Sequence, residues 1–303
     1  MDFNQKPNYS QEISSSTPGA ILFLVDQSRS MNKPFGTNAS GQPVKRAEVV
    51  AEALNNTLAE LVNRCTRDEG VSDYFEVGVI GYGRNSRPEF CWEGPLKGRR
   101  MVSISEVAKH AHVEQKTIET EVRGTIVNET VSVSSWLSPV AGESTPMNGA
   151  INMARQTLEE WIYRNPKCFP PIVINITDGM ANDVSSANEL IMSTKRLTDL
   201  TTTDGQVLLI NCHITDENDT TVTFPWSKME LPDEDYARIL FEMSSDMPER
   251  YKAIICEIFD RDQSQTPIVK GMAFNADATA LVKLLDIGTR QAFVINAASH
   301  AAE

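Results

Sequence analysis

The sequence has 303 residues, of which 41% are hydrophobic, so it can bury the core of one large α/β domain or of two small ones. Its 28 basic and 41 acidic side chains give a net charge of −13. This charge argues against binding to nucleic acid or to an anionic membrane surface, because both demand clustered Lys and Arg. We interpret the one tight basic cluster in the sequence, Lys97, Arg99 and Arg100, as a solvated turn and not as a phosphate site.

The cysteines and the N-terminal stretch bear on the compartment. The five cysteines are widely spaced and include no C-x-x-C pair, which is typical of small buried residues in a reducing compartment: Cys65, Cys91, Cys168, Cys212 and Cys256. Residues 1–17 form a polar lead-in without an apolar core, and no apolar run approaches ~18 residues. We therefore expect neither a signal peptide nor a membrane span, and a cytoplasmic protein.

A buried strand and a polar triplet follow the lead-in. Residues 20–25 form an apolar run of strand length, as expected for a parallel strand buried on both faces. Asp26, Ser28 and Ser30 follow at alternate positions, past the carboxyl end of that strand, where open α/β sheets bind ligands. One carboxylate and two hydroxyls suit Mg²⁺, Mn²⁺ or Ca²⁺, although the same residue types also cap helices in many turns.

The next segment alternates between helix and strand. A loop over Gln27–Gln42 leads to a helix that starts near Pro43 or Val44 and runs to about Thr66, with apolar residues at three- and four-residue steps. A second strand is expected at Phe75–Tyr82. The glycines near its end do not match a phosphate-binding loop, which requires Gly-Lys-Ser/Thr at the opening of a helix.

Residues 84–140 separate the predicted strand at Phe75–Tyr82 from the next strong helix pattern. Thr117–Val133 alternates apolar and polar side chains, which predicts hairpins that add an antiparallel edge to the sheet. His110 and His112 would share a face of a strand, but the sequence supplies no evident third ligand. We therefore do not assign a zinc site here.

Two more polar side chains follow at the ends of predicted elements. A helix pattern opens at Pro146, and Thr145 stands just before it, where its hydroxyl either caps the helix or faces a metal. A second buried strand, Ile172–Thr177, ends at Asp178. If the sheet is parallel, Thr145 and Asp178 reach the same edge as the polar triplet. We interpret Asp183, five residues further on, as a loop or helix cap.

The remaining sequence continues the alternation of strands and helices, without an internal repeat or a low-complexity tract. Its predicted elements are a helix at Ala187–Leu200, a strand at Val207–Ile214, a loop at Thr215–Pro232, a helical stretch at 233–259 with a break near Pro248, a short strand near Val269–Phe274 and a final helix at about Asp277–Thr289.

The order D-x-S-x-S, then Thr, then Asp, each at the carboxyl edge of the sheet, resembles a von Willebrand factor type A (vWA) domain with a metal-ion-dependent adhesion site. The resemblance covers about residues 18–290. It implies a doubly wound, mostly parallel α/β sheet flanked by helices, with a β-rich insertion. It also implies a set of metal ligands: Asp26, Ser28, Ser30, Thr145 and Asp178.

The same resemblance leads to a domain plan with one vWA domain. The plan has a lead-in over 1–17, a single domain over 18–292 that contains the inserted segment 84–140 and a loop plus helical segment 215–260, and a C-terminal tail over 293–303. We expect the insertion and the loop Thr215–Pro232 to leave from the metal edge, flank the site and select the partner. The alternative is that the insertion only covers the far edge of the sheet.

The proposed ligand set favours binding over cleavage. Three of its five members are neutral hydroxyls, which leave a divalent cation electrophilic. Mg²⁺ takes six oxygens in an octahedron, so at least one position stays open. The resemblance implies that an Asp or Glu carboxylate of a partner protein completes the shell. We expect Mg²⁺, with Mn²⁺ or Ca²⁺ as alternatives.

The expected function is accordingly a metal-dependent protein-interaction module and not an enzyme. The resemblance points to a regulatory or assembly subunit of a bacterial signalling, stress or defence system, working beside an ATPase, kinase or phosphatase. One alternative is a metal-dependent hydrolase or phosphotransferase, although the second Asp that haloacid dehalogenase-type phosphatases need is Ser28 here. The sequence also contains no Ser-His-Asp set or H-E-x-x-H motif. Another alternative is a structural subunit whose metal only braces the loops.

Overall fold

The computed structural model describes residues 9–37, 41–122, 125–215 and 220–290. In this part of the chain the main sheet has eight strands, and its central strands run parallel. In spatial order the parallel strands are β14 (Met272–Ala276), β12 (Leu208–Ile214), β11 (Ile172–Thr177), β1 (Gly19–Asp26) and β6 (Phe75–Tyr82). Antiparallel strands extend both sides, namely β13 (Val222–Thr223) next to β14, and β7 (Pro88–Phe90) and β8 (Val102–Ser103) next to β6.

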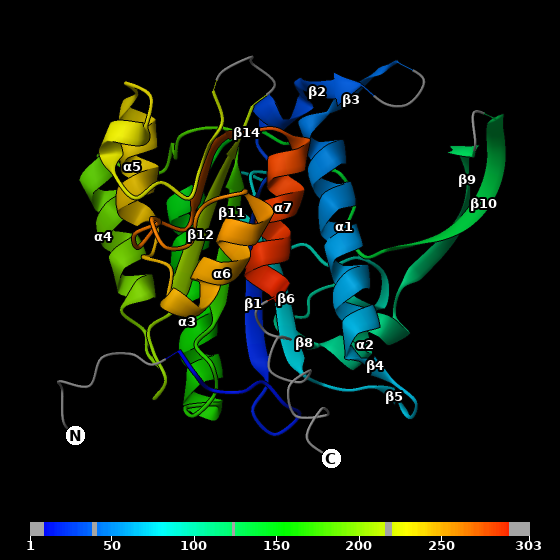
Figure 1. Ribbon diagram of the computed structural model, residues 1–303, viewed down its shortest axis with the longest axis horizontal. Helices are drawn as coiled ribbons and strands as arrows, with labels where there is room; N and C mark the ends of the chain where they lie inside the picture. The colour runs from blue at the N-terminus through cyan, green and yellow to red at the C-terminus, as the bar shows by residue number, and fades with distance from the viewer. Residues whose placement is uncertain (1–8, 38–40, 123–124, 216–219, 291–303) are drawn as a thin grey trace.

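Helices cover both faces of this sheet (Figure 1). One face is covered by α1 (Arg46–Cys65), α2 (Ile104–Lys109), α6 (Glu249–Ile258) and α7 (Ala278–Arg290). The other face is covered by α3 (Met147–Arg164), α4 (Ala187–Thr198) and α5 (Asp235–Met243). The predicted doubly wound, mostly parallel α/β fold is confirmed.

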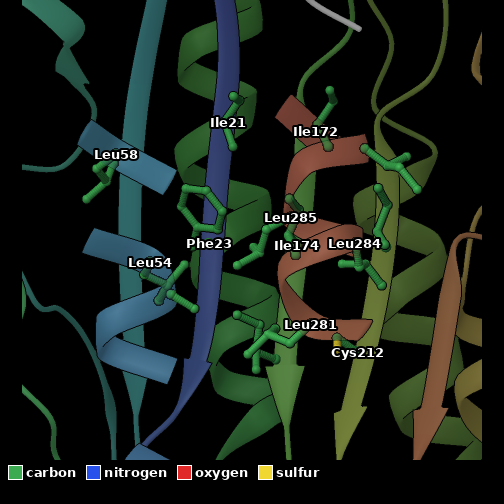
Figure 2. Packing of buried hydrophobic residues seen from close by; sticks show 14 of the residues in the cluster. Ile21, Phe23, Leu54, Leu58, Ile172, Ile174, Cys212, Leu281, Leu284 and Leu285 are labelled. Carbon is green, nitrogen blue, oxygen red and sulfur yellow. The ribbon is translucent and has the colours of Figure 1, made fainter. Parts of the chain in front are cut away.

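Strand β1 lies at the centre of both cores because its side chains alternate between the two faces. Ile21 and Phe23 pack with residues of α1 and α7, as Figure 2 shows, whereas Leu22 and Leu24 belong to the core under α3 and α5. All eight residues of β1 are buried. Each large apolar side chain buried in this way contributes about 1.5–3 kcal/mol of transfer free energy, which is why the sequence shows an uninterrupted apolar run here.

The path of the chain creates a point where strand order reverses. From β1 the chain crosses one face through α1 to reach β6, and it later crosses the other face through α3 to reach β11, on the opposite side of β1. Loops therefore leave the carboxyl ends of β1 and β11 toward opposite faces. Open α/β sheets bind ligands in the crevice at such a point.

The predicted element boundaries hold closely, with two informative differences. The loop expected over Gln27–Gln42 contains a short 3₁₀ helix, Arg29–Asn32, and strand β2 (Pro34–Thr37). Strand β2 pairs with β3 (Pro43–Lys45), so α1 begins three residues later than Pro43. The helical stretch expected at 233–259 is divided into α5 and α6, and Pro248 directly precedes α6 as predicted.

The inserted segment 84–140 is built differently from the prediction. The antiparallel edge of the sheet comes from β7 and β8, which pair with different parts of β6. The alternating stretch instead forms β9 (His112–Val122) and β10 (Thr125–Ser135), which pair only with each other and stand beside α1 at the side of the molecule (Figure 1). The expectation that this hairpin extends the main sheet is wrong, because β7 and β8 already occupy that edge of β6.

The loop after β12 also departs from the expected course. Strand β13 pairs antiparallel with β14, with Val222 opposite Phe274 and Thr223 opposite Ala273, so the chain turns back toward the amino ends of the strands. Trp226 and Met229, which are 51% and 94% exposed, follow this turn. Only the start of the predicted loop Thr215–Pro232 therefore lies at the carboxyl edge of the sheet.

The described part of the predicted lead-in is attached to the body of the protein. The backbone amides of Ser10 and Gln11 donate to the carboxylate of Asp204 at 2.9 and 3.1 Å. Residues 1–8 and the predicted tail 293–303 lie outside the described residues. Strands β4 (Thr66–Arg67) and β5 (Gly70–Val71) form a small separate pair after α1.

Candidate metal centre

The two predicted carboxylate ligands stand at the ends of neighbouring parallel strands. Asp26 is the last residue of β1, and Asp178 directly follows β11. The register pairs Val25 with Ile176, which brings both strand ends to one edge of the sheet. The alternation of a parallel sheet, already visible in the sequence, is therefore what brings these two side chains together.

The backbone amide of Ser28 and the hydroxyls of Ser28 and Ser30 connect the two carboxylates. The backbone amide of Ser28 donates to Asp26 Oδ1 at 2.8 Å, and the Ser28 and Ser30 hydroxyl oxygens lie 2.9 Å apart. Ser30 Oγ donates to Asp178 Oδ1 at 2.6 Å. Four of the five predicted ligands thus belong to one hydrogen-bonded cluster, in which the Ser28 amide makes the link to Asp26.

Thr145 reaches the same edge through its loop. Gly142 N donates to Gln27 O, so the loop before α3 is bound to the turn that carries the triplet. The backbone of Thr145 exchanges two hydrogen bonds with Asn182, at 3.0 and 3.1 Å, in the loop that follows Asp178. The backbone contacts thus place Thr145 between the loops that follow β1 and β11.

Asp183 accepts hydrogen bonds from the start of the helix that follows Thr145. Its carboxylate accepts from the amides of Asn148 and Gly149 at 3.1 and 2.7 Å, in the first turn of α3. The interpretation of Asp183 as a helix cap is confirmed. Because Asp183 satisfies these free amides of α3, the helix does not need the Thr145 hydroxyl as its cap.

Gly83 allows the loops at this edge to come close. Its φ is +127°, and a Cβ added there would meet Ser144 O at 2.6 Å and Ser28 N at 2.7 Å. Any side chain at this position would push the Thr145 loop away from the triplet. Gly83 is one of the glycines that did not match a phosphate-binding loop in the sequence. The structure shows that it is required for this close approach of the loops.

The electrostatics of the cluster favour a cation. Asp26 is fully buried, and burial together with the nearby charge of Asp178 raises the pKa of Asp26 to about 7, although hydrogen bonds from Ser28 and Thr177 act in the opposite direction. Two buried carboxylates that repel each other are stabilised by a positive charge between them. Carboxylate and hydroxyl oxygens are also the donors that Mg²⁺ and Ca²⁺ take. The residues present therefore fit the divalent cation that the sequence implied.

Sequence reasoning missed Arg46, the first residue of α1. Its Nη1 donates to Asp178 Oδ2 at 2.8 Å, and the Arg46 and Asp178 side chains are 4% and 0% exposed. The sequence does hold a signal for it. Arg46 stands four and eight residues before Val50 and Leu54, and these spacings place it on the buried face of the helix.

Three further residues outside the predicted set surround the carboxylates. Thr177 Oγ1 lies 2.9 Å from Asp26 Oδ2, and the Tyr236 hydroxyl on α5 donates to Gly179 O. His213 pairs in register with Thr177 and stacks on Phe274 with ring centroids 4.4 Å apart. Burial lowers the pKa of His213 to about 4, so this imidazole is neutral at neutral pH.

Comparisons with known proteins give distant structural likenesses. No family model matches the chain, and no curated protein matches it significantly. The vWF domain of the type V pili tip protein Mfa5 from Porphyromonas gingivalis is 9% identical, with a TM-score of 0.41, over 93% of this chain and 96% of that chain. The proximal thread matrix protein 1 from the mussel byssus is 13% identical, with a TM-score of 0.44, over 94% of this chain and 50% of that chain.

A third solved structure found by the comparison is the ArnB paralog VWA2 from Sulfolobus acidocaldarius. It is 14% identical, with a TM-score of 0.33, over 65% of this chain and 35% of that chain. The chain therefore spans half the length of the mussel protein and about a third of the Sulfolobus one. Likenesses this distant assign no function.

The other candidate sites in the described residues resolve into surface contacts. His112 Nε2 lies 3.0 Å from Glu114, and no group of three or more His, Cys, Asp or Glu side chains in the described ranges could hold a metal. Arg99 and Arg100 pair with carboxylates of Glu106 and Glu160, which leaves the basic cluster without the character of a phosphate site. All five cysteines are free thiols. No helix among the described residues is long and apolar enough to cross a membrane.

Proposed function

We propose that this chain is a protein-interaction module that binds a divalent cation and, through it, a carboxylate of a partner protein. The ligands are the predicted set, namely Asp26, Ser28, Ser30, Thr145 and Asp178. The observation that carries the proposal is the hydrogen-bonded chain that runs from Asp26 through the Ser28 amide and the Ser28 and Ser30 hydroxyls to Asp178, at the reversal point of the sheet. We expect Mg²⁺ in the cell, with Mn²⁺ or Ca²⁺ as alternatives.

A carboxylate is the ligand that the charges of this site favour. Only two of the five protein ligands are ionised, and Arg46 offsets one of them. A divalent cation in the site keeps an excess positive charge, and an anionic oxygen from outside neutralises it. Mg²⁺ also requires six oxygens, so five protein ligands leave one position for the partner.

A hydrolytic or phosphotransfer role is the first alternative, and the chemistry of the site gives it little support. Ser28 stands where a second aspartate would be needed. His213 is a weak base, because burial lowers its pKa to about 4, and its Nδ1 accepts from the amide of Asn275 at 3.4 Å. We propose that the chain is not an enzyme.

A purely structural metal is the second alternative. Hydrogen bonds already hold the loops of the site together, through Gly142, Asn182 and Asp183, without any metal. A binding module should therefore keep its fold and lose its partner when the metal ligands are altered. A structural metal would make the same changes destroy the fold.

The setting that we propose is a cytoplasmic regulatory or assembly subunit of a bacterial signalling, stress or defence system. The five free thiols support a reducing compartment. The resemblance of the motif supports a partner such as an ATPase, kinase or phosphatase. The acidic net charge of −13 argues against nucleic acid and against an anionic membrane as partners.

Calorimetric titration with Mn²⁺ tests the metal-binding part of the proposal. The variant Ser28→Ala/Ser30→Ala removes two ligands without altering the charge of the site, and Ser15→Ala, in the exposed lead-in, is the control. We expect one Mn²⁺ per chain in the wild type and in the control, and a loss of at least about tenfold in affinity in the double variant. Equal Mn²⁺ affinity in all three proteins would contradict the proposal.

The partner is sought with the same proteins. Immobilised wild type and control should retain one or more proteins in Mg²⁺ that EDTA releases, whereas the folded double variant should retain none of them. If the double variant does not fold although the control does, the structural alternative gains the support that the binding module loses.

A further inference from the structure

Arg46 places a buried positive charge on one of the proposed metal ligands. Its guanidinium is held at the start of α1, where the Arg46 amide also donates to Lys33 O at 3.0 Å. The ion pair with Asp178 has an N–O distance of 2.8 Å and is almost entirely shielded from water. A buried charge that is not compensated is costly, so this pair is a fixed part of the metal-free site.

The two oxygens of Asp178 have different partners. Oδ2 accepts from the Arg46 guanidinium, whereas Oδ1 accepts from the Ser30 hydroxyl and so belongs to the oxygen cluster. Arg46 therefore orients the carboxylate and leaves one oxygen on the side of the hydroxyls. With Asp26 and Asp178 ionised, the two carboxylates and the Arg46 guanidinium together carry a charge of −1, against −2 for the carboxylates alone.

We propose that Arg46 is a built-in counter-charge that couples the binding of the divalent cation to the binding of an external carboxylate. This inference rests on the proposed function of the site. Arg46 holds Asp178 in place when the metal is absent, and its charge weakens the binding of the metal alone. A divalent cation brings the summed charge of Asp26, Asp178, Arg46 and the cation to +1, and one incoming carboxylate neutralises it.

The physical argument is electrostatic. Two positive charges close to the same carboxylate repel each other strongly where water is excluded. A site without Arg46 would become neutral as soon as it bound a divalent cation, and it would attract a carboxylate less. Arg46 therefore makes the site a poor binder of metal alone and a better binder of metal together with a partner.

Mn²⁺ binding, followed by the electron paramagnetic resonance of the free ion, tests this role at a fixed pH and ionic strength. Arg46→Gln removes the charge and keeps hydrogen-bond donors, whereas Arg46→Lys keeps the charge. The control is Arg155→Gln, which removes an arginine paired with Glu159 on the outer side of α3. We expect Arg46→Gln to bind Mn²⁺ at least about tenfold more tightly than the wild type, and the Lys and control variants to stay within about threefold of it.

Acetate serves as the probe for the external carboxylate. Added acetate should tighten Mn²⁺ binding to the wild type and to Arg155→Gln more than to Arg46→Gln. In EDTA, Arg46→Gln should melt at a lower temperature than the control, because it leaves Asp178 without its buried partner. Mn²⁺ affinity that is equal or weaker in Arg46→Gln, or an acetate effect of equal size in both, would overturn the proposal.

The outcomes separate this inference from the proposed function. If the wild type binds no Mn²⁺ but Arg46→Gln does, the proposed metal-bound function fails, and Arg46 is shown to oppose the metal. If neither protein binds Mn²⁺, both proposals fail. If both bind it equally, the proposed function stands and the role of Arg46 is refuted.

A double variant keeps the test decisive if Arg46→Gln does not fold. Arg46→Gln/Asp178→Asn replaces the ion pair by two neutral amides, so neither charge is left buried without its partner. The double variant should fold and melt in EDTA at a higher temperature than Asp178→Asn alone. A double variant that also fails to fold would show that Arg46 is needed for packing and not as a counter-charge, and would overturn the proposal.

Discussion

Replacing Asp26 by Asn should stabilise the metal-free protein at alkaline pH. The carboxylate is fully buried, and burial beside Asp178 raises its pKa from the ordinary 3.8 to about 7. Each pKa unit corresponds to about 1.4 kcal/mol, so ionising Asp26 costs about 4 kcal/mol more in the folded protein than in the unfolded chain. Asn stays neutral at every pH and does not incur this cost.

The hydrogen bonds around Asp26 accept an amide. Thr177 Oγ1 lies 2.9 Å from Asp26 Oδ2 and 2.8 Å from Gly179 O. A hydroxyl has one proton to donate, so Thr177 can donate to Gly179 O while it accepts from the amide of Asn at position 26. The oxygen of that amide can keep the hydrogen bond that Ser28 N now donates to Asp26 Oδ1 at 2.8 Å.

The raised pKa of Asp26 determines whether the free energy of unfolding rises or falls with pH. The folded protein binds the Asp26 proton more tightly than the unfolded chain does, so this contribution to stability is complete below about pH 4 and is lost as the pH rises through about 7. Between about pH 5 and about pH 8 the wild type should lose roughly 2.5 kcal/mol relative to Asp26→Asn. All other titrating groups are present in both proteins. Their contributions therefore cancel when the free energy of unfolding of the wild type is subtracted from that of Asp26→Asn.

Urea unfolding in EDTA, at both pH values, measures this difference. Asp199→Asn is the control, because Asp199 is a half-exposed carboxylate that pairs with Lys195 on the surface. We expect the free energy of unfolding of Asp26→Asn to exceed that of the wild type at the higher pH, and the gap to shrink at the lower pH. A gap of the same size at both pH values would refute the claim that burial beside Asp178 raises the pKa of Asp26.

Three more predictions follow from the site and the fold. Mg²⁺ or Mn²⁺ at a hundredfold excess over its dissociation constant should stabilise the wild type by about 2.7 kcal/mol relative to EDTA, whereas coincident melting curves would contradict an occupied site. Replacing residues 112–135 by a short Gly/Ser link should keep the fold and the Mn²⁺ affinity, since this hairpin pairs only with itself. Loss of folding would instead show that the hairpin stabilises the core. Incubation with Mg²⁺ and generic phosphoesters should release no phosphate above a protein-free blank, and turnover that Ser28→Ala abolishes would favour the enzyme alternative.

The sequence was sufficient to predict the central sheet and the edge at which the candidate ligands meet. Each parallel strand is buried on both faces, so it appears as a short apolar run, and the polar residue that ends the run marks the carboxyl edge. Asp26 and Asp178 could be placed together on that basis alone. Their actual hydrogen bonds, with Ser28 and Ser30 between them, are the local consequence of the turn after β1.

What the sequence did not predict depends on contacts between distant residues. Alternation in the stretch 117–133 correctly indicated strands, but it carried no information on which edge those strands would pair with. Two short segments, β7 and β8, took the edge of β6, although their lengths of three and two residues give no recognisable period. The turn of β13 back along β14 likewise depends on the pairing of Val222 with Phe274.

Arg46 is the most consequential omission, because a charged residue at a helix start is ordinarily exposed. The helical spacing from Arg46 to Val50 and Leu54 pointed to burial, but only the position of Asp178 explains how the charge is tolerated.

Only part of the inserted segment 84–140 can be deleted without loss of core residues. Val102, Ile104 and Val107 are buried in the core, so a deletion that reaches back to residue 97 would remove part of it.

The most direct test of the central claim is whether an external carboxylate enters the coordination shell of a cation held by this site. Electron–nuclear double resonance of the Mn²⁺-loaded wild type with ¹³C-carboxyl-labelled acetate detects the label only when it is bound close to the ion. We predict a ¹³C hyperfine coupling in the wild type and in Ser15→Ala, and its absence in Ser28→Ala/Ser30→Ala. A wild type that binds Mn²⁺ with no such coupling at saturating acetate would contradict the claim that the cation presents an open position to a partner carboxylate.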